Sequence, residues 1–599
     1  MMEVDPQLTP PSPLKSPTSK TTGESTLKYT ANLHHQGAFQ MMHHLQRTKQ
    51  MCDVILDVGD LSLHVHKIVL ASCSSYFHAM FTNDMVEKDS KNVRLHDVDP
   101  TAMELLIEFM YTSEITVTES NVQILLPAAS LLQLQSVREA CCKFLIKQLH
   151  PTNVLGIRNF ADTHSCEELL TLSHTFTLHN FVEVCETEEF LLLPFTEILQ
   201  FVKSEDLCIV SEEQVFRSVV KWVKHDLDAR GPYISQLLSH VKLPLLSRDF
   251  LMNSVESEEF IRSNSECKDL LLEAMKYHLM PNHRDGLQTQ RTRLRRSKDL
   301  KPVLVAVGGG SLFSIHSEVE FYDTMTDTWT IVASMLSRRA RAGVVSVNRM
   351  LYAIGGYDGA MDLCTAECYN PLVNSWTMIS CMGTRRSCLG VCEWNSLVYA
   401  VGGYDGASCL SNAERYDPLT EQWTSIAAMT YKRRYLKLVV LDNHIYAVGG
   451  YDGCSHLPSV EKYNPHTNRW VTIPNMLSRR SNCGAAVLDR MIYVCGGNDG
   501  STVLSSVERY SPRRGVWETV APMHSRRSTH DAIVMDGMLY AVGGNDGSSS
   551  LNTIERYDPK LNRWTVILPM NLRRSGVGAA VVEITSNLRK KLQGTVGTF

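Results

Sequence analysis

Hydrophobic and polar positions alternate in short runs through the second half of this chain. The run VYAVGG, which begins at Val398, is apolar, rich in β-branched and aromatic residues, and ends in two glycines. The turn residues YDG follow, and then the half-apolar runs AERYDP and EQWTSIAAM. Short apolar runs of this composition, bounded by Gly and Asp, predict β-strands that are joined by tight turns.

The same pattern returns every 47 residues. The eight residues YAVGGYDG occur at Tyr399 and again at Tyr446, with near copies at Tyr352, Tyr493 and Tyr540. Six successive repeats carry a Gly pair, a Glu, a Tyr and a Trp at matching places. Four strands per repeat, at a period in the forties, predict the blades of a β-propeller.

The repeated residues have physical roles in such blades. Glycines without side chains allow neighbouring backbone to approach closely near the propeller axis. The Tyr and Trp supply large buried faces, and the Glu is expected to accept hydrogen bonds from the backbone or from a repeated basic pair. These basic pairs are Arg338-Arg339, Arg385-Arg386, Lys432-Arg433, Arg479-Arg480, Arg526-Arg527 and Arg573-Arg574.

The two ends of the repeat region complement each other. The region opens at KPVLVAVGGG, which is already the strand that ends in glycines, with no first strand before it. It closes with RRSGVGAAVVEI, Arg573 to Ile584, a first strand with no blade after it. We therefore expect the last strand to complete the first blade, which closes the ring and removes an open sheet edge.

These repeats closely resemble the kelch repeat family over about 285 residues. The first repeat departs from the family pattern, because GGGSLFS stands where the others carry GGYDG or GGNDG, so its loop is expected to differ. The resemblance implies an all-β, six-bladed kelch propeller closed by a C-terminal strand.

The first half of the chain has a different pattern. From about Tyr29 to His150 it is mixed α/β: CDVILDV predicts a strand, LSLHVHKIVLASCSSYFHAMF a strand and a helix, and AMELLIEFMYTSEITV a helix and a strand. Residues 151–280 predict helices, with EEQVFRSVVKWVKHDL clearly amphipathic. The first pattern resembles a BTB domain and the second a BACK domain, so the whole chain resembles the kelch-like (BTB–BACK–kelch) family.

The resemblance and the composition together predict a multidomain protein. The expected segments are a Pro/Ser/Thr-rich tail at 1–28, an α/β BTB domain at 29–149, an all-α BACK domain at 150–280, a polar linker at 281–301, the propeller at 302–586 and a tail at 587–599. Within the linker, RTRLRRSK resembles a nuclear localisation run, but a solvated linker is the favoured interpretation.

Composition and charge narrow the class of protein. The net charge of −5 over 599 residues argues against a nucleic-acid-binding surface. We find neither an apolar run long enough to cross a membrane nor a secretory signal at the N-terminus. The 17 cysteines are scattered along the sequence and are expected to be reduced thiols. We therefore expect a cytoplasmic protein, with association with the cytoskeleton or a nuclear location as alternatives.

In the kelch-like family the BTB domain forms homodimers and binds cullin-3, and the propeller recruits a substrate protein for ubiquitination. The family's cullin-binding motif is an apolar residue, any residue, then Glu, which Met85-Val86-Glu87 matches. The nearby aromatic residues Tyr76, Phe77 and Phe81 would line the same surface. The alternative is that these aromatics are core residues and Glu87 is merely solvated.

The family's ligand face consists of loops after the Gly pairs and loops around the basic pairs. The resemblance places these candidate residues on it: Tyr357, Tyr404, Tyr451, Asn498, Asn545, Ser387, Arg434, Ser481, Ser528 and Ser575, with Ala340 in the first register. Arg434 interrupts the series of serines, and we predict that it marks a pocket for an acidic side chain. An unliganded surface charge is the alternative.

Rival functions find less support in the residues. A copper-radical oxidase is known on kelch propellers, but the histidines of this propeller lie in different registers of the repeat, and no hydrolase, phosphate-loop or zinc-protease motif occurs. We therefore expect no catalytic, cofactor-binding or metal site. The run LHHQGAFQMMHHL is expected to be a helix that packs Phe39, Met42 and Leu45 rather than a metal site. An actin-binding scaffold is the alternative function, because a BTB dimer would make the propellers bivalent.

Overall fold

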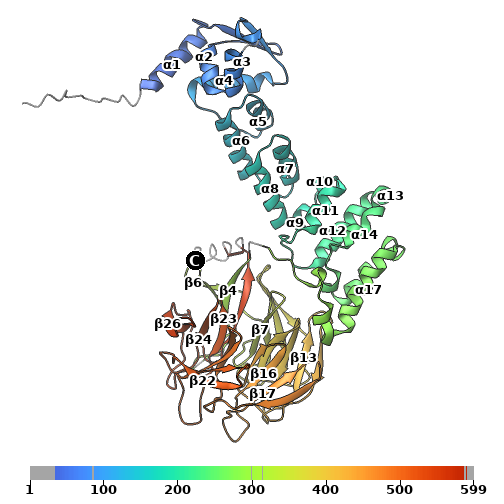
Figure 1. The fold of residues 1–599 in the computed structure, drawn as a ribbon, viewed down its shortest axis with the longest axis vertical. Helices are drawn as coiled ribbons and strands as arrows, with labels where there is room; N and C mark the ends of the chain where they lie inside the picture. The colour runs from blue at the N-terminus through green and yellow to red at the C-terminus, as the bar shows by residue number, and fades with distance from the viewer. Residues whose placement is uncertain (1–33, 84–85, 298–299, 313, 586–587, 590–599) are drawn as a thin grey trace, which may run out of the picture. The chain divides into compact units, whose positions relative to one another are not determined.

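The computed structural model describes residues 34–83, 86–297, 300–312, 314–585 and 588–589 (Figure 1). The predicted tail at 1–28 lies outside these residues, as does most of the tail at 587–599. The chain forms two compact units, Met1–Leu149 with Ile157–Ser173, and His150–Gly156 with His174–Phe599.

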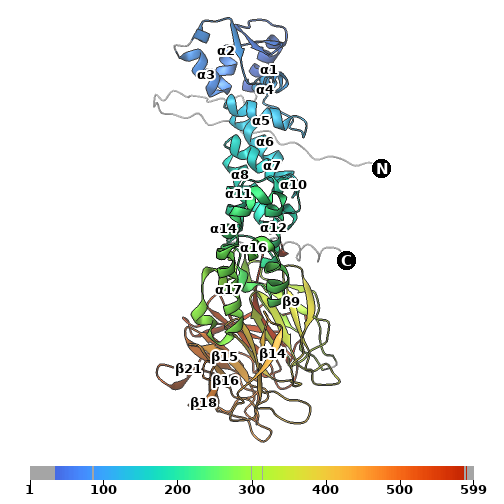
Figure 2. The same ribbon diagram turned by 90° about the vertical axis from the view of Figure 1, so that its right-hand side faces the viewer.

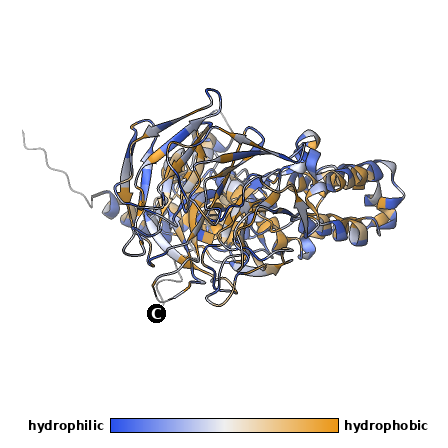
Figure 3. Ribbon diagram, turned by 90° about the horizontal axis from the view of Figure 1, so that it is seen from below, coloured by the Kyte–Doolittle hydropathy of each residue, from blue (hydrophilic) through white to orange (hydrophobic). Residues whose placement is uncertain are grey.

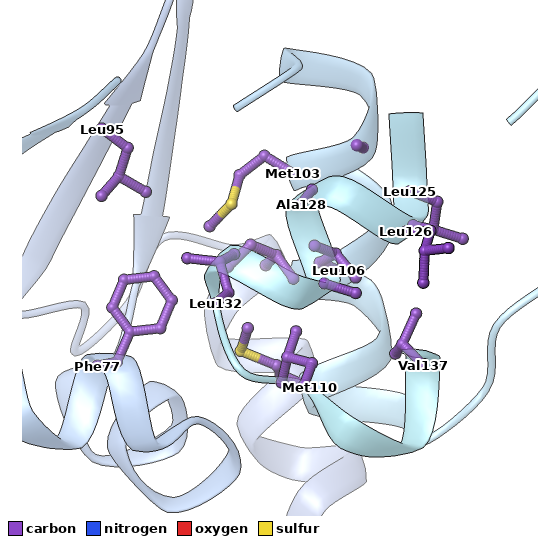
Figure 4. Packing of buried hydrophobic residues seen from close by; sticks show 14 of the residues in the cluster. Phe77, Leu95, Met103, Leu106, Met110, Leu125, Leu126, Ala128, Leu132 and Val137 are labelled. Atoms are coloured by element: carbon purple, nitrogen blue, oxygen red, sulfur yellow. The ribbon is translucent and has the colours of Figure 1, made fainter. Parts of the chain in front are cut away.

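The first unit contains a small sheet covered by helices. Strand order is β2-β1-β3, with β1 antiparallel to β2 and parallel to β3. Its elements are α1 (His34–Arg47), β1 (Val54–Val58), β2 (Leu61–Val65), α2 (Lys67–Cys73), α3 (Ser75–Thr82), η1 (Val86–Lys88), β3 (Asn92–Leu95), α4 (Pro100–Thr112), α5 (Val122–Leu131) and α6 (Gln135–Lys147). One continuous hydrophobic core joins sheet and helices, and Figure 4 shows Phe77, Met103 and Leu132 within it.

Two sequence predictions for this unit have different outcomes. The helix at LHHQGAFQMMHHL is present as α1, and its Phe39 and Met42 pack against the core. The strand expected after α4 is wrong, because residues 113–117 form no strand. Ile115 and Val117 of this stretch still pack against the core, so their apolar character reflects burial without a strand partner.

Helices follow as predicted for residues 151–280. They are α7 (Val154–Thr163), α8 (Glu167–His179), α9 (Phe181–Val184), α10 (Glu188–Leu191), α11 (Phe195–Lys203), α12 (Glu212–His225), α13 (Leu227–Arg230), α14 (Ile234–Leu238), α15 (Arg248–Phe250), α16 (Glu259–Arg262) and α17 (Ser265–Leu279), with short turns η2 (Gly231–Tyr233), η3 (Leu243–Leu245) and η4 (Leu251–Val255). Figures 1 and 2 both place α17 beside one end of the propeller.

The second half of the chain forms six four-stranded antiparallel sheets. The blades are β7 (Gly343–Val347), β8 (Met350–Ile354), β9 (Ala366–Asn370), β10 (Ser375–Ile379); β11 (Gly390–Trp394), β12 (Leu397–Val401), β13 (Ala413–Asp417), β14 (Gln422–Ile426); β15 (Lys437–Leu441), β16 (His444–Val448), β17 (Val460–Asn464), β18 (Arg469–Ile473); β19 (Gly484–Leu488), β20 (Met491–Cys495), β21 (Val507–Ser511), β22 (Val516–Val520); β23 (Asp531–Met535), β24 (Met538–Val542), β25 (Ile554–Asp558), β26 (Arg563–Ile567); and β27 (Gly578–Ile584), β4 (Lys301–Val307), β5 (Val319–Asp323), β6 (Thr328–Val332). Hydrophobic residues lie mainly in the propeller interior (Figure 3).

The predicted ring closure is confirmed. Strand β27, from the end of the chain, pairs antiparallel with β4, from Gly578 opposite Val307 to Ile584 opposite Lys301. The first strands of the blades contact one another in the order β7, β11, β15, β19, β23, β27, and β27 contacts β7 again. The propeller is therefore a closed ring of six blades.

Buried ion pairs tie the connection that enters each blade to the third strand of that blade. In the blade of β7, Arg339 donates to Glu367 on β9 at 2.9 Å and to the carbonyl oxygens of Gly355 and Thr365. Glu367 also accepts from the backbone N–H of Leu336 and Ser337, as the repeat predicted. The equivalent pairs are Arg386–Glu414, Arg433–Glu461, Arg480–Glu508, Arg527–Glu555 and Arg574–Glu320.

The stretch predicted as a polar linker is packed. It contains two short 3-10 segments, η5 (Pro281–Leu287) and η6 (Gln290–Thr292). Its Arg284 is fully buried and makes a bidentate pair with Asp417 of β13, and its Arg295 makes another with Glu212 of α12. The solvated character expected for RTRLRRSK is thus wrong for Arg295, and buried ion pairs join the helices of the second unit to its propeller.

Candidate partner-binding surfaces

The two sets of candidate loop residues on the propeller lie together. Residues after the Gly pairs form isolated β-bridges with residues after the basic pairs, so both sets occupy one end of the blades. The bridges are Ala340–Tyr357, Ser387–Tyr404, Arg434–Tyr451, Ser481–Asn498, Ser528–Asn545 and Gly310–Ser575. The first blade thus differs as expected, with Gly310 in the place of Tyr or Asn.

The loops after the Gly pairs are held by their own hydrogen bonds. The hydroxyl groups of Tyr404 and Tyr451 each donate to the carbonyl oxygen of the glycine two residues later, at 3.0 Å. The carboxylate of Asp405 accepts from the backbone N–H of Ser408 and Ala407, and these bonds lower its pKa. The tyrosine rings stay half-exposed on loops that are already ordered, which reduces the entropy cost of binding a partner.

Several of the predicted serines are buried. Ser387, Ser481 and Ser528 have relative exposures of 2%, 0% and 8%. The Ser481 hydroxyl is 2.8 Å from Nδ1 of His456, so its hydrogen-bonding capacity is used inside the loop layer. These serines are better placed to order the loops than to contact a partner, whereas Ser575 remains half-exposed.

Arg434 lies between two of the candidate tyrosines. Its guanidinium carbon is 5.0 Å from the ring centroids of both Tyr404 and Tyr451. Its Nε atom is buried and has no hydrogen-bond partner among the described residues. A guanidinium that is stacked on aromatic rings and lacks a carboxylate presents a fixed fork of donors to an acidic group.

A ring of six backbone hydrogen bonds surrounds the propeller axis next to this surface. Each N–H donates to the carbonyl oxygen of the equivalent residue one repeat earlier, at 2.7–3.0 Å, and Arg341 donates to Gly576 to close the ring. All six residues have left-handed backbone conformations, with φ between 52° and 64°. They are Arg341, Cys388, Tyr435, Asn482, Thr529 and Gly576, and they line a cavity of about 50 Å³.

The axial cavity is polar on one side. Lys437 and Asp531 form an ion pair of 2.7 Å between blades that are two repeats apart. The four equivalent positions are glycines, Gly343, Gly390, Gly484 and Gly578. His530, beside this pair, is fully buried, and burial together with the nearby Arg527 and Lys437 lowers its pKa well below the ordinary value.

On the first unit, the candidate surface follows α3. Phe77 is fully buried in the core, while Tyr76, Phe81 and Glu87 are half-exposed. The Phe77 ring stacks on Phe81 at 5.9 Å and meets Tyr76 edge-on at 5.5 Å, so Phe77 supports the two outer rings. Met85 and the side chain of Val86 lie outside the described part of the chain.

Comparison with known proteins accounts for all three regions. Family models match residues 42–149 as a BTB/POZ domain, 154–256 as BTB And C-terminal Kelch, 338–383 as a Kelch motif and 394–585 as a KLHDC2/KLHL20/DRC7 Kelch-repeats domain. The chain is 55% identical to Kelch-like protein 17 of Homo sapiens over 342 residues, 57% of this chain and 53% of that protein. It is 46% identical to Kelch-like protein 2 of Homo sapiens over 329 residues, 55% of each chain.

The chain belongs to the kelch-like (BTB–BACK–kelch) family. Its matched region spans about half the length of these curated relatives. None of the four matched models describes a catalytic domain.

Two further observations concern the composition of this kelch-like protein. All 17 cysteines are free thiols, most of them buried, as expected for small apolar core residues. No helix among the described residues is long and apolar enough to span a membrane.

Sequence reasoning missed the axial ring of this kelch-like protein. The signal was present, because the six ring residues stand two places after each Arg of the ion pairs. Their side chains share no chemistry, however, and only the backbone conformation repeats. The variable position two places after each repeated Arg marks these residues in the sequence.

Proposed function

We propose that this protein is a non-catalytic substrate adaptor of a cullin-3 ubiquitin ligase. In this proposal the BTB domain forms homodimers and binds cullin-3, and the kelch propeller recruits the substrate protein. The proposal rests on the presence of two candidate binding surfaces in one chain. The BTB domain has a half-exposed aromatic and acidic surface after α3. The propeller has an ordered, aromatic loop surface on which Arg434 has no carboxylate partner among the described residues.

The cullin-3 surface would be formed by Tyr76, Phe81 and Glu87, supported by the buried Phe77. Lys67 strengthens this surface, because its Nζ lies 5.4 Å from the Phe81 ring and donates to the carbonyl oxygen of Lys88 at 2.7 Å. The turn that carries Glu87 is thus attached to α2. Aromatic anchors beside a polar residue are typical of interface hot spots.

The substrate surface would centre on Arg434 and its two flanking tyrosines. A carboxylate that bound the guanidinium would meet a group whose position Tyr404 and Tyr451 already fix, so little side-chain entropy would be lost on binding. A hydrogen bond to a charged group contributes about 1.5–3 kcal/mol, so loss of this cation should weaken a substrate complex about tenfold or more.

The direct test is a calorimetric titration of the full chain with the N-terminal domain of cullin-3. We expect saturable binding by the unmodified protein and its loss in a Met85→Asp, Glu87→Ala variant. Glu119→Ala, an exposed carboxylate elsewhere in the BTB domain, is the matched control and should bind like the unmodified protein.

Absence of binding by the unmodified protein would contradict the adaptor proposal. Equal binding by the double variant would contradict the assigned surface while leaving the adaptor function supported. If cullin-3 does not bind, co-sedimentation with actin filaments would test the scaffold function that the sequence offered as the alternative.

A further inference from the structure

A groove on the helices of the second unit belongs to neither surface described above. Its volume is about 660 Å³, compared with about 50 Å³ for the axial cavity. It is bordered by α10, α12, α15 and η4. Helices α10 and α12, which are labelled in Figure 1, pack against each other. Volumes of several hundred Å³ are those of binding sites rather than of packing defects.

The groove has an apolar floor. Phe216 and Val220 of α12 and Phe250 of α15 line it, and the rings of Phe216 and Phe250 meet edge to face at 5.6 Å. Two exposed side chains stand next to lining residues in the sequence. Leu192 is 71% exposed and Met252 is 42% exposed, although both are large hydrophobic residues.

One side of the groove is cationic. Arg217, Lys221 and Lys224 follow one another at spacings of four and three residues, which places them on the same side of α12. His225 joins them, and Glu258 is the one carboxylate among the described lining residues. The lining thus carries an excess of positive charge beside apolar side chains.

The existing ion pairs of these cations are weak. Lys221 pairs with Glu186 at 2.6 Å, but the two side chains are 37% and 74% exposed. Arg217 is 3.6 Å from Glu213, and Lys224 pairs with Glu258 at 2.7 Å, again at the surface. Exposed pairs of this kind contribute about 0–1 kcal/mol, so an entering carboxylate can replace or join them at little cost.

The wall opposite α12 is irregular. Residues Leu251–Val255 form a π-helix, and its Asn253 and Ser254 line the groove. Single π-helical turns are rare and occur frequently at functional sites, since they interrupt the regular hydrogen bonding of a helix. With Ser257 and Glu258, which follow it, this turn makes the wall largely polar.

We propose that this groove binds an acidic amphipathic helix of a partner protein. Apolar residues of the helix, three and four positions apart, would pack on the floor formed by Phe216, Val220 and Phe250. Its carboxylates would face Arg217, Lys221 and Lys224. A nucleic acid fits the site less well, because the floor is apolar. The inference is independent of the proposed adaptor function.

The test uses a labelled peptide of about 16 residues, long enough to form a helix, with Leu and Phe on one face and Glu on the other. Fluorescence anisotropy with the full-length protein should show saturable binding. A peptide with Lys in place of Glu, and a scrambled peptide of the same composition as the first, should bind about tenfold more weakly or worse.

Variants locate the binding. Lys221→Glu with Lys224→Glu should weaken the acidic peptide about tenfold. Asn253→Asp, a negative charge added at an exposed lining residue, should weaken it without unfolding the protein. Lys268→Glu with Lys276→Glu, on the exposed side of α17, makes the same change of charge and should have no effect. Equal binding of all three peptides, or equal losses in the two double variants, would overturn the proposal.

Discussion

The buried Arg–Glu pairs and the loop surface of the propeller lie a few residues apart in the sequence, yet they follow opposite rules. An Arg–Glu pair occurs at the equivalent position of all six blades. Every blade has the same buried backbone groups at this position, and they need the same hydrogen-bond partners. The next residue along the chain is Ala340, Ser387, Arg434, Ser481, Ser528 or Ser575. The residues that repeat are thus those that the fold of every blade requires, whereas the variable residue after each Arg gives each blade its own loop chemistry.

The two sets of residues should contribute to different free energies, one to folding and the other to binding. A buried charge that loses its partner is costly, whereas an unpaired cation at the surface costs little. Changes in the repeated register should therefore affect stability, and changes in the variable register should affect binding.

The largest effect is expected for the pair that closes the ring. Arg574→Ala leaves Glu320 buried without its cation and should lower the free energy of unfolding by about 3–5 kcal/mol. Urea unfolding followed by tryptophan fluorescence measures this. Arg573→Ala, the exposed neighbour, should cost less than about 1 kcal/mol, and equal losses in the two variants would contradict the division.

The repeated glycines should come next. Gly449 has a positive φ, and a Cβ there would collide with the backbone oxygen of Arg480, so Gly449→Ala should cost about 3 kcal/mol. Gly515 also has a positive φ but open space around it, and Gly515→Ala should cost about 1 kcal/mol. The difference between the two, measured by the same unfolding experiment, isolates the close approach of the backbone. Similar losses would show that strain in φ alone explains both.

His530 should make the propeller sensitive to mild acid. Burial lowers its pKa in the folded protein below the ordinary 6.5, so the unfolded chain binds the proton more readily. The stability contributed by the neutral ring should therefore be complete above pH 6.5 and fall by about 1.4 kcal/mol per pH unit below it.

The matched variant is His530→Leu, since Leu389 and Leu436 occupy the same register in other blades. Urea midpoints measured between pH 7.5 and pH 5 should lose much of their pH dependence in this variant. An unchanged pH dependence would assign it instead to His278 and His316, whose pKa values are also lowered by burial.

The smallest effect on stability is expected for Arg434→Ala. This side chain has no carboxylate partner, so its removal should change the free energy of unfolding by about 0.5 kcal/mol or less. Thermal unfolding compared with Arg433→Ala, which removes a fully buried pair, makes the contrast sharp. A loss as large as that of Arg433→Ala would mean that Arg434 is a structural residue.

The sequence predicted the features that repeat. The 47-residue period predicted the blades, the incomplete ends predicted the pairing of β27 with β4, and the repeated Glu predicted an acceptor for the basic pair. It could not show that Ser387 and Ser481 are buried, because small polar residues suit both a loop surface and a loop interior. The groove beside α12 was not predictable either, since Leu191, Phe216 and Phe250 come together only through tertiary packing.

The most direct test separates the two binding surfaces of the proposed adaptor in cells. The unmodified protein, Arg434→Ala and the Met85→Asp, Glu87→Ala variant would each be purified, and co-purifying proteins and their ubiquitin modifications measured by mass spectrometry. We predict a set of proteins that co-purify with the Met85→Asp, Glu87→Ala variant, here called the cullin-site variant, but not with Arg434→Ala. The ubiquitination of these proteins should fall in cells that carry either variant. Ubiquitination of those proteins that persists unchanged in the cullin-site variant would contradict the account.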